Sequence, residues 1–119
     1  MIVENTQTQM RKGILEYCIL SIISRGEIYA SDIINELKTA RLLVVEGTLY
    51  PLLTRLKNNA LLSYIWKESN SGPPRKYYQI TPAGQDVLKA LDETWNELVF
   101  AVQTSTNTLN KEENKEINL

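Results

Sequence analysis

One stretch, from Glu46 to Leu56, constrains the fold more than any other. Its leucines lie at positions 49, 52, 53 and 56, the spacing that lines one face of an α-helix. Proline is tolerated mainly in the first turn of a helix, where its missing N–H would have no intrahelical partner. Pro51 therefore predicts a helix that starts near Gly47 or Thr48, with a threonine cap. We interpret the stretch as a short helix docked by leucines, and the alternative is a plain amphipathic surface helix.

Composition limits the class of protein. A chain of 119 residues with 43% hydrophobic content predicts one domain with a modest core and an appended helix. It has no 18-residue apolar run and no signal-peptide pattern, so we expect no membrane association and a cytoplasmic location. The single cysteine, Cys18, cannot form an intrachain disulfide, which also suits a reducing cytoplasm. We expect it to be a small buried hydrophobic residue rather than a reactive thiol.

Charge is distributed unevenly along the chain. The net charge is −1, but residues 38–76 hold seven basic side chains against two acidic ones, a net of +5. Residues 86–119 hold three basic side chains against seven acidic ones, a net of −4. A basic middle beside an acidic end is typical of a nucleic-acid-binding protein with a separate non-binding element, although a solvated basic face is also common.

Helical spacing predicts two helices before the central stretch. The first covers Met10–Ser24, and the polar residues 1–8 before it are frayed or form its beginning. The second covers Ala30–Ala40, and Ser31 or Asp32 stabilises its start by capping or through the helix dipole. The apolar residues Leu42–Val45 then predict a buried turn or a short extended connector.

The periodicity changes after Leu61, where apolar and polar residues alternate up to Lys67 and predict a strand. Turn-forming residues fill 69–74, and Arg75–Thr81 predicts the second strand of a hairpin. Thr81 followed by Pro82 is typical of a helix N-cap with proline at the first helical position. Within the hairpin we expect three aromatic side chains in the core, namely Tyr64, Trp66 and Tyr78.

The last helix carries the clearest heptad pattern, which is typical of a left-handed coiled coil. The pattern lasts about two heptads, so we expect the helix to pack on the first helix and on a partner subunit. The predicted dimerisation residues are Leu88, Leu91, Trp95, Leu98, Val99 and Val102. The expected organisation is a DNA-binding domain over residues 1–81, a dimerisation helix over 82–108 and a disordered tail over 109–119.

Three helices followed by a hairpin is the order of a winged helix-turn-helix, so the predicted fold is mainly α with a small β-hairpin. In that architecture the third helix enters the major groove and the hairpin wing contacts the flanking backbone. Polar and cationic groups on both elements can donate to phosphates or base edges. The predicted DNA-binding residues are Thr48, Tyr50, Pro51, Thr54, Arg55, Lys57, Asn58, Lys67, Arg75 and Lys76.

The residue types present argue against an enzyme. The chain has no histidine, which removes an imidazole base, a Ser/His pair and a histidine-containing metal cluster. Its five glycines are isolated, so no phosphate-binding loop is present. We therefore expect no enzyme activity, no cofactor and no metal.

Three segments together resemble the PadR-type winged-helix transcriptional regulators. Lys12–Glu16 is similar to the opening helix of that family, Glu46–Leu56 to its recognition helix, and Gly72–Gly84 to its wing and the entry to the last helix. The resemblance covers residues 10–102 and implies a homodimeric repressor that a ligand releases from its promoter. The chain departs from the family pattern at Tyr29–Ile33, and it resembles only short members with one C-terminal helix.

Trp95 allows two interpretations. In short drug-sensing members of that family, a tryptophan near the middle of the last helix stacks flat aromatic compounds at the dimer centre, and Trp95 resembles that position. The alternative is a dimer-core anchor, because Trp95 lies on the heptad seam. The acidic neighbours Asp92, Glu93 and Glu97 would favour a cationic ligand.

The sequence thus predicts a dimeric repressor that binds double-stranded DNA at an inverted-repeat operator and responds to a small aromatic or cationic ligand. Two other classes are considered. A winged helix can act as a protein-interaction or scaffold module that does not bind DNA, but such a module has no need of a basic middle. A small-molecule carrier built around Trp95 is the third possibility.

Overall fold

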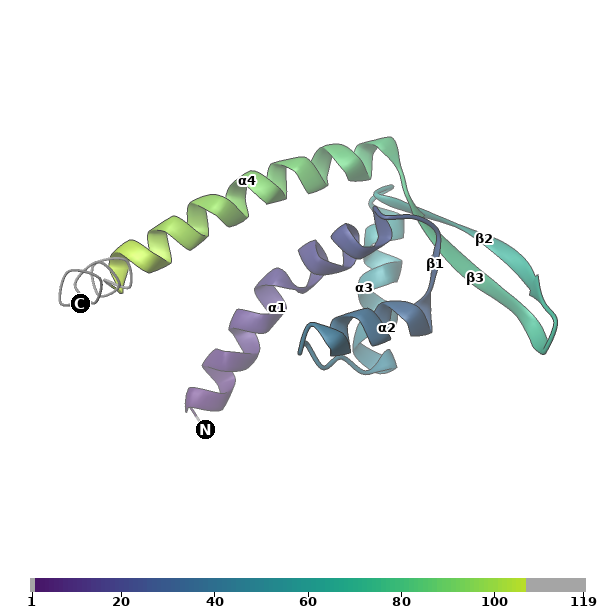
Figure 1. The fold of residues 1–119 in the computed structure, drawn as a ribbon, viewed down its shortest axis with the longest axis horizontal. Coiled ribbons are helices and arrows are strands. Elements are labelled where there is room, and N and C mark those ends of the chain that lie inside the picture. Colours follow the sequence, from purple (N-terminus) through teal and green to yellow (C-terminus); the bar gives the residue numbers. More distant parts are fainter. Residues whose placement is uncertain (1, 107–119) are drawn as a thin grey trace, which may run out of the picture. The chain divides into compact units, whose positions relative to one another are not determined.

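A computed structural model describes residues 2–106 of the chain (Figure 1). The elements in order are α1 (Ile2–Ile23), β1 (Ile28–Tyr29), α2 (Ala30–Thr39), α3 (Glu46–Asn58), β2 (Leu62–Ser69), β3 (Gly72–Ile80) and α4 (Pro82–Ser105). They confirm the predicted fold class, a mainly helical winged helix-turn-helix with a long last helix. The described residues fall into two compact units, one up to Leu88 and one from Lys89 onward. The predicted tail over 109–119 lies outside the described residues.

The sheet has three antiparallel strands in the order β1-β3-β2, one more than the predicted hairpin. The additional strand, β1, has only two residues, and it pairs Ile28 with Tyr78 and Tyr29 with Tyr77. Two residues are too few to show an alternating pattern, which is why the sequence did not reveal this strand. β1 fixes the hairpin of β2 and β3, called the wing below, to the start of α2.

The turn of the wing is shorter than predicted. Ser69 pairs with Gly72, so only two residues form the turn, and the predicted loop residues Pro73 and Pro74 lie in β3. The register shifts between Lys67 and Ser69, which leaves one extra residue on β3. Prolines lack a backbone N–H and fit a strand at such an irregularity. The prolines therefore did not end the strand as the prediction assumed.

The core of the first unit is built from aliphatic side chains of the three N-terminal helices, closed by the sheet. Eight side chains are almost completely buried, and each such side chain contributes roughly 1.5–3 kcal/mol relative to exposure. They are Ile19, Leu20, Ile23, Ile33, Leu37, Leu49, Leu53 and Leu56. Three of the four leucines predicted to dock α3 are in this set, and the fourth, Leu52, is half-buried. The docking face of the central stretch is as predicted.

The starts of α1 and α2 lie where the predictions allowed, but the side-chain caps expected for α2 and α3 are absent. α1 extends back to Ile2, and neither α2 nor α3 has a side-chain cap at its start. Asp32 does lie in the first turn of α2, where a carboxylate interacts favourably with the helix dipole. α3 begins at Glu46, so Pro51 is its sixth residue and removes the hydrogen bond that an N–H there would donate to the carbonyl of residue 47.

The connector between α2 and α3 is not a buried turn, which was one of the two forms predicted for it. Leu43 is 81% exposed and Val45 is 71% exposed, while Leu42 and Val44 are half-buried. The C-terminal ends of α2 and α3 are each followed by a residue in the left-handed backbone region. These residues are Arg41, with φ 65°, and Ala60, with φ 61°. These residues close the last turns of α2 and α3 through backbone hydrogen bonds.

A close backbone approach marks the start of α4. The Thr81 hydroxyl accepts a hydrogen bond from the Gly84 N–H at 3.0 Å, which confirms the predicted cap with Pro82 at the first helical position. The same hydroxyl donates to the Ala60 carbonyl at 2.7 Å. A Cβ on Gly84 would lie 2.1 Å from the carbonyl oxygen of Leu61. Only glycine fits here, because the atom it would meet is rigid backbone.

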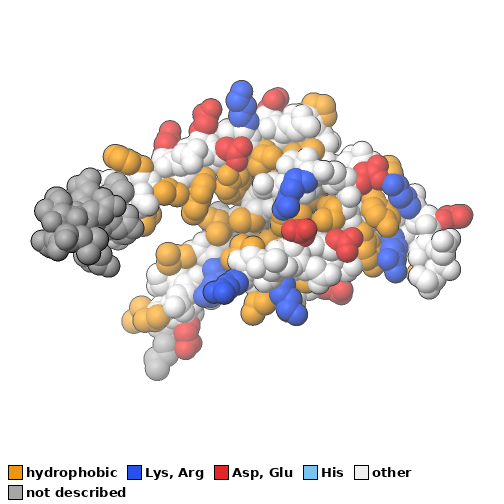
Figure 2. Space-filling model, viewed as in Figure 1, with side chains coloured by type: hydrophobic (Ala, Val, Ile, Leu, Met, Phe, Trp, Pro, Cys, Tyr) orange, Lys and Arg blue, Asp and Glu red, His pale blue; other side chains and the backbone are white. Residues whose placement is uncertain are grey.

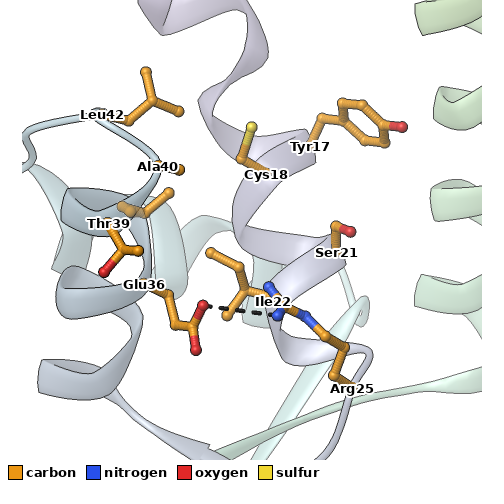
Figure 3. A pocket seen from close by; sticks show the side chains of 10 residues that line it. Tyr17, Cys18, Ser21, Ile22, Arg25, Glu36, Thr39, Ala40 and Leu42 are labelled. Carbon is orange, nitrogen blue, oxygen red and sulfur yellow. Dashed lines mark ion pairs between the residues drawn. The ribbon is translucent and has the colours of Figure 1, made fainter.

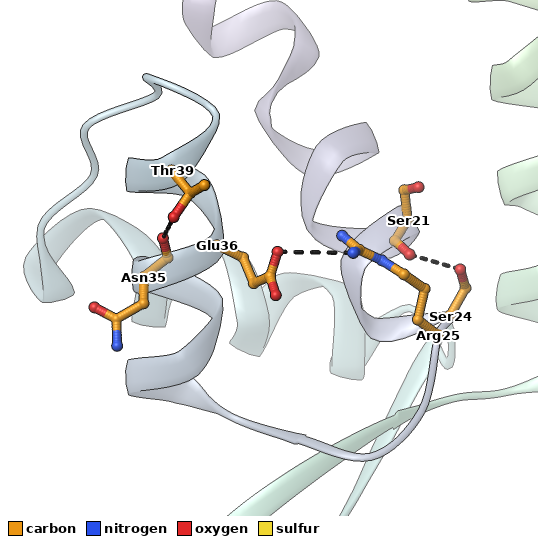
Figure 4. A network of polar contacts seen from close by, with 6 residues as sticks. All are labelled: Ser21, Ser24, Arg25, Asn35, Glu36 and Thr39. Carbon is orange, nitrogen blue, oxygen red and sulfur yellow. Dashed lines mark hydrogen bonds and ion pairs between the residues drawn. The ribbon is translucent and has the colours of Figure 1, made fainter.

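An open hollow of about 350 Å³ lies between α1 and α2, lined by Cys18 and Leu42 among others (Figure 3). An ion pair between Arg25 and Glu36, 3.7 Å apart, links the two helices beside it (Figure 4). Cys18 is half-buried rather than buried, and desolvation raises the pKa of its thiol.

Within residues 2–106 no helix is long and apolar enough to cross a membrane.

Candidate nucleic-acid interface

The outward face of α3 forms an open depression of about 580 Å³. Its leucines are turned into the core, so the intervening positions are left on the surface. Five of the predicted DNA-binding residues line the depression together with Asn59, namely Tyr50, Pro51, Thr54, Arg55 and Asn58. All five are exposed. The depression is lined largely by apolar atoms, but four of these five side chains carry donors or acceptors that can meet phosphates and base edges.

Tyr50 is the most central of these residues, because it lines this depression and the groove beside the wing. Its side chain is 44% exposed. Partial burial, followed by the nearby Glu46 carboxylate and Tyr29, raises the pKa of the Tyr50 hydroxyl above its ordinary value. The hydroxyl therefore stays protonated at neutral pH and can donate a hydrogen bond to a phosphate oxygen.

Arg55 is not available without a rearrangement. Its guanidinium forms an ion pair with the Glu16 carboxylate of α1 at 3.2 Å. The Arg55 side chain is 68% exposed, so solvent screens the pair, which is worth at most about 1 kcal/mol. A DNA phosphate can therefore displace Glu16 from Arg55, with the loss of at most this ion-pair energy. Glu16 was not among the predicted site residues, since the sequence does not show which carboxylate faces α3.

The wing presents its cations on aromatic rings. The Lys76 ammonium lies 4.5 Å from the Tyr64 ring centroid and 5.3 Å from that of Trp66. The Arg75 guanidinium lies 4.7 Å from the Tyr29 ring centroid. Cations in this position are attracted by the negative face of the ring. Aromatic rings therefore hold two of the three basic side chains of the predicted wing site, Arg75 and Lys76.

A groove of about 440 Å³ connects the wing to α2 and α3. Aromatic rings and the two wing cations line most of it, and its residues are Tyr29, Ala30, Tyr50, Trp66, Pro73, Pro74, Arg75, Lys76 and Tyr78. Because Tyr50 lines both hollows, the groove and the depression on α3 adjoin one another. Basic side chains are visible over this end of the molecule in Figure 2.

Three of the predicted residues line neither the depression nor the groove. Lys57 of α3 is exposed beside them, and its ammonium lies 5.5 Å from the Tyr64 ring centroid. Lys67 pairs with the carboxylate of Glu27, so its charge is largely neutralised, and it also lies 5.0 Å from the Tyr77 ring centroid. Thr48 is exposed but lines a separate hollow between α1 and the connector, with Arg11 and Leu15. The structure does not bring these three residues into the depression or the groove.

The position of Trp66 differs from the prediction. It was expected in the hairpin core, yet it is 60% exposed and lines the groove, while Tyr64 is half-buried and Tyr78 is buried as predicted. Alternation placed all three on one face of the hairpin, and they do share that face. The core covers this face of the hairpin only at the end far from the turn. A residue closer to the turn, such as Trp66, therefore lies outside the core. Distance from the turn is the signal that could have identified Trp66.

The last helix exposes half of the residues of the predicted heptad seam. Trp95 is 41% exposed, Leu98 49% and Val102 58%, while Leu88, Leu91 and Val99 are half-buried. Phe100, which was not predicted, is 65% exposed. Acidic as well as hydrophobic side chains follow α4 (Figure 2). Several large apolar side chains exposed along one helix often mark an interaction surface.

The described part of the chain, residues 2–106, holds no group of three or more side chains that could bind a metal ion. The side chains gathered at the site are phenols, an indole, amides and cations, which bind anions and stack on bases. The arrangement can recognise a polyanion, and no described side chain there is set up as a general base.

Comparison with known proteins agrees with this geometry. A family model described as "Transcriptional regulator PadR-like family" matches residues 19–90. A PadR-like transcription factor from Bacteroides fragilis is 60% identical, with a TM-score of 0.71 over 83% of this chain and 96% of that one. A PadR-like regulator from Bacillus cereus is 39% identical, with a TM-score of 0.73 over 81% and 94% of the two chains. A PadR family regulator from Eggerthella lenta is 32% identical, with a TM-score of 0.78 over 87% and 90%.

Proposed function

Because the chain belongs to the PadR-like family of transcriptional regulators, we propose that it is a sequence-specific repressor that binds an inverted-repeat operator as a homodimer. It acts in the cytoplasm, where the DNA is, and it is not an enzyme. The observation that carries the proposal is the pair of adjoining hollows on α3 and the wing, which share Tyr50. The first presents the donors and acceptors of α3 side chains, and the second holds cations on aromatic rings.

In the proposed complex α3 lies in the major groove and the wing follows the flanking backbone. Thr54, Arg55 and Asn58 project from α3 toward base edges and phosphates. Lys57, Arg75 and Lys76 contact phosphates, as does the protonated Tyr50 hydroxyl. Pro51 adds a rigid apolar surface that can touch a thymine methyl group.

Dimerisation is proposed to occur through α4. Its apolar seam spans about two heptads, which is too short to be stable as an isolated coil and therefore needs a partner. The half-exposed side chains of Trp95, Leu98 and Val102 are the surface that a second copy would cover. Two subunits joined in this way would place their α3 helices in half-sites about one helical turn, roughly 34 Å, apart.

Trp95 is also the proposed point of ligand control. A planar aromatic compound can stack on an indole, and the acidic side chains of Asp92, Glu93 and Glu97 favour a cationic one. A ligand at the dimer centre would shift the relative tilt of the two DNA-binding domains, and so the affinity for DNA. The alternative role of Trp95 is a dimer-core anchor without ligand binding.

DNA binding is tested by fluorescence anisotropy with labelled duplexes from the region upstream of the protein's own gene. The expected result is tighter binding to one upstream duplex than to a shuffled duplex of the same composition, with affinity rising as salt is lowered. Arg55→Ala should weaken specific binding by about 1–3 kcal/mol. Arg25→Ala is the matched control, because Arg25 lies at the end of α1, outside both hollows.

Equal binding to specific and shuffled duplexes at every salt concentration would contradict the proposal. No binding to either would favour the scaffold module, in which the winged helix contacts protein rather than DNA.

A further inference from the structure

Two lysines from different elements converge on one aromatic ring. Building on the proposed DNA-binding function, we propose that Lys57 of α3 and Lys76 of β3 form a single site for the phosphate backbone of one DNA strand. In this site Tyr64 and Trp66 are positioning residues that hold the two ammonium groups. The site joins the recognition helix to the wing, so one stretch of backbone contacts both elements.

The geometry of this cluster is specific. The Lys57 ammonium lies 5.5 Å from the Tyr64 ring centroid, and the Lys76 ammonium lies 4.5 Å from the same centroid. Lys76 is also 5.3 Å from the Trp66 ring centroid, so it sits between two rings. These rings meet edge to face, with centroids 6.2 Å apart and planes at 87°. Lys76 thus occupies a two-walled aromatic corner, and Lys57, from α3, lies over Tyr64, one of the two rings that form it.

The aromatic corner is anchored to the core. The Tyr64 ring contacts the Tyr78 ring at a centroid distance of 6.0 Å, and Tyr78 is 5% exposed. Tyr64 is therefore fixed by a buried neighbour, while Trp66 remains exposed beside it. A lysine side chain loses much rotational freedom when it binds a ligand. Holding the ammonium on a fixed ring reduces that loss, because part of the ordering is already present.

Charge explains why the site needs an anion. Two ammonium groups near one ring repel each other, and no ion pair joins either lysine to a carboxylate within residues 2–106. The wing's other lysine, Lys67, differs because Glu27 neutralises it. A phosphate near Lys57 and Lys76 would relieve their repulsion, and an ammonium is a suitable point charge for it. The cluster is therefore a distinct anion site and not just part of a basic surface.

The test uses the upstream duplex that binds best, with single phosphates replaced by neutral methylphosphonates. Neutralising the phosphate held by the cluster should weaken binding of the unchanged protein several-fold. Lys57→Met, Lys76→Met and the double variant should lose sensitivity to the same phosphate or its immediate neighbour on that strand. The slope of log affinity against log salt should also fall by about 0.9 for each lysine lost per subunit. Lys89→Met, on α4, is the control and should change neither quantity.

The positioning role is tested with Tyr64→Phe and Tyr64→Leu. Phenylalanine keeps a ring under both cations and should preserve the affinity and the methylphosphonate pattern. Leucine removes the ring and should weaken binding several-fold. In the double variant Tyr64→Leu, Lys76→Met, the loss of affinity should be smaller than the sum of the two single losses. Thermal unfolding of each variant checks that the fold is retained, and Tyr64→Phe remains informative if Tyr64→Leu is unstable.

Three results would overturn this inference. The two lysines could respond to phosphates that are on different strands or several nucleotides apart, or their loss could leave the salt slope unchanged. Tyr64→Phe could also weaken binding as much as Tyr64→Leu, which would assign the effect to the hydroxyl. Each result can be obtained while the unchanged protein still binds its duplex specifically. Loss of the proposed function would appear differently, as no preference for any upstream duplex.

Discussion

Replacing Gly84 with alanine should strongly destabilise the fold. The new Cβ would lie 2.1 Å from the Leu61 carbonyl oxygen and 2.7 Å from Cγ1 of Ile80. The oxygen belongs to the backbone at the end of the turn after α3, so relief requires movement of α4 away from this turn. Overpacking typically costs 1–3 kcal/mol, and a contact this short with backbone belongs at the upper end, about 3 kcal/mol.

Part of that cost is offset, because alanine is better than glycine inside a helix by roughly 0.5–1 kcal/mol. The net loss for Gly84→Ala is then about 2 kcal/mol. In a domain of this size that corresponds to a fall of roughly 8–15 °C in melting temperature. It also lowers the urea midpoint by about 1 M if the urea dependence is near 2 kcal/mol per M.

The matched control is Gly13→Ala. Gly13 also lies inside a helix, α1, but nothing would lie within 4 Å of its new Cβ. This variant should gain up to about 1 kcal/mol from helix propensity alone. Both variants should be compared by urea unfolding at one protein concentration, since a dimer's stability depends on concentration. If Gly84→Ala proves as stable as Gly13→Ala, the close approach of Gly84 to Leu61 is wrong.

Three other predictions address the DNA-binding face, the sheet and the last helix. Glu16→Gln should free Arg55 and raise DNA affinity up to about fivefold in anisotropy titrations, while Glu36→Gln, which faces Arg25, should have no effect. Burial raises the pKa of the Tyr78 hydroxyl above its ordinary value of 10.0. The folded state should therefore lose stability as pH rises from about 10 to the pKa of the folded state. Tyr78→Phe should reduce this loss in unfolding curves, and an unchanged pH profile of stability would refute the prediction. Planar cationic dyes should quench Trp95 fluorescence in a Trp66→Phe background, and the absence of quenching across a broad dye panel would leave only the dimer-core role.

The helical part of the fold could be predicted from the sequence because its signals are local and repeated. Leu49, Leu53 and Leu56 are buried as their spacing required. Thr81 and Pro82 start α4 as expected, because an N-cap acts within one helical turn. The same reasoning placed the start of α3 one or two residues too late, since Pro51 is tolerated slightly further into the helix than assumed.

The sheet was less predictable, because its details depend on partners far away in the sequence. β1 exists only because β3 pairs with it, and the two prolines of β3 are accommodated by a register shift against β2. Trp66 has the residue type of a core position but lies on the part of the wing that the core does not cover. No local pattern distinguishes these cases.

The candidate site shows the same division. Exposure of the polar face of α3 followed from the helix period. The pairing of Arg55 with Glu16, and of Lys67 with Glu27, depends on how α1 and the segment after it pack, which a single sequence does not encode locally. The convergence of Lys57 and Lys76 on Tyr64 likewise requires the three-dimensional meeting of α3 and the wing.

The central claim is that two copies of α3 bind one inverted-repeat operator. Hydroxyl-radical footprinting of the protein on its own upstream DNA tests it most directly. The account predicts two equivalent protected half-sites, related by a dyad and separated by about one helical turn, roughly 34 Å. Arg55→Ala should weaken protection of both half-sites together. A single unsymmetrical protected site, or uniform protection along the DNA, would contradict the account.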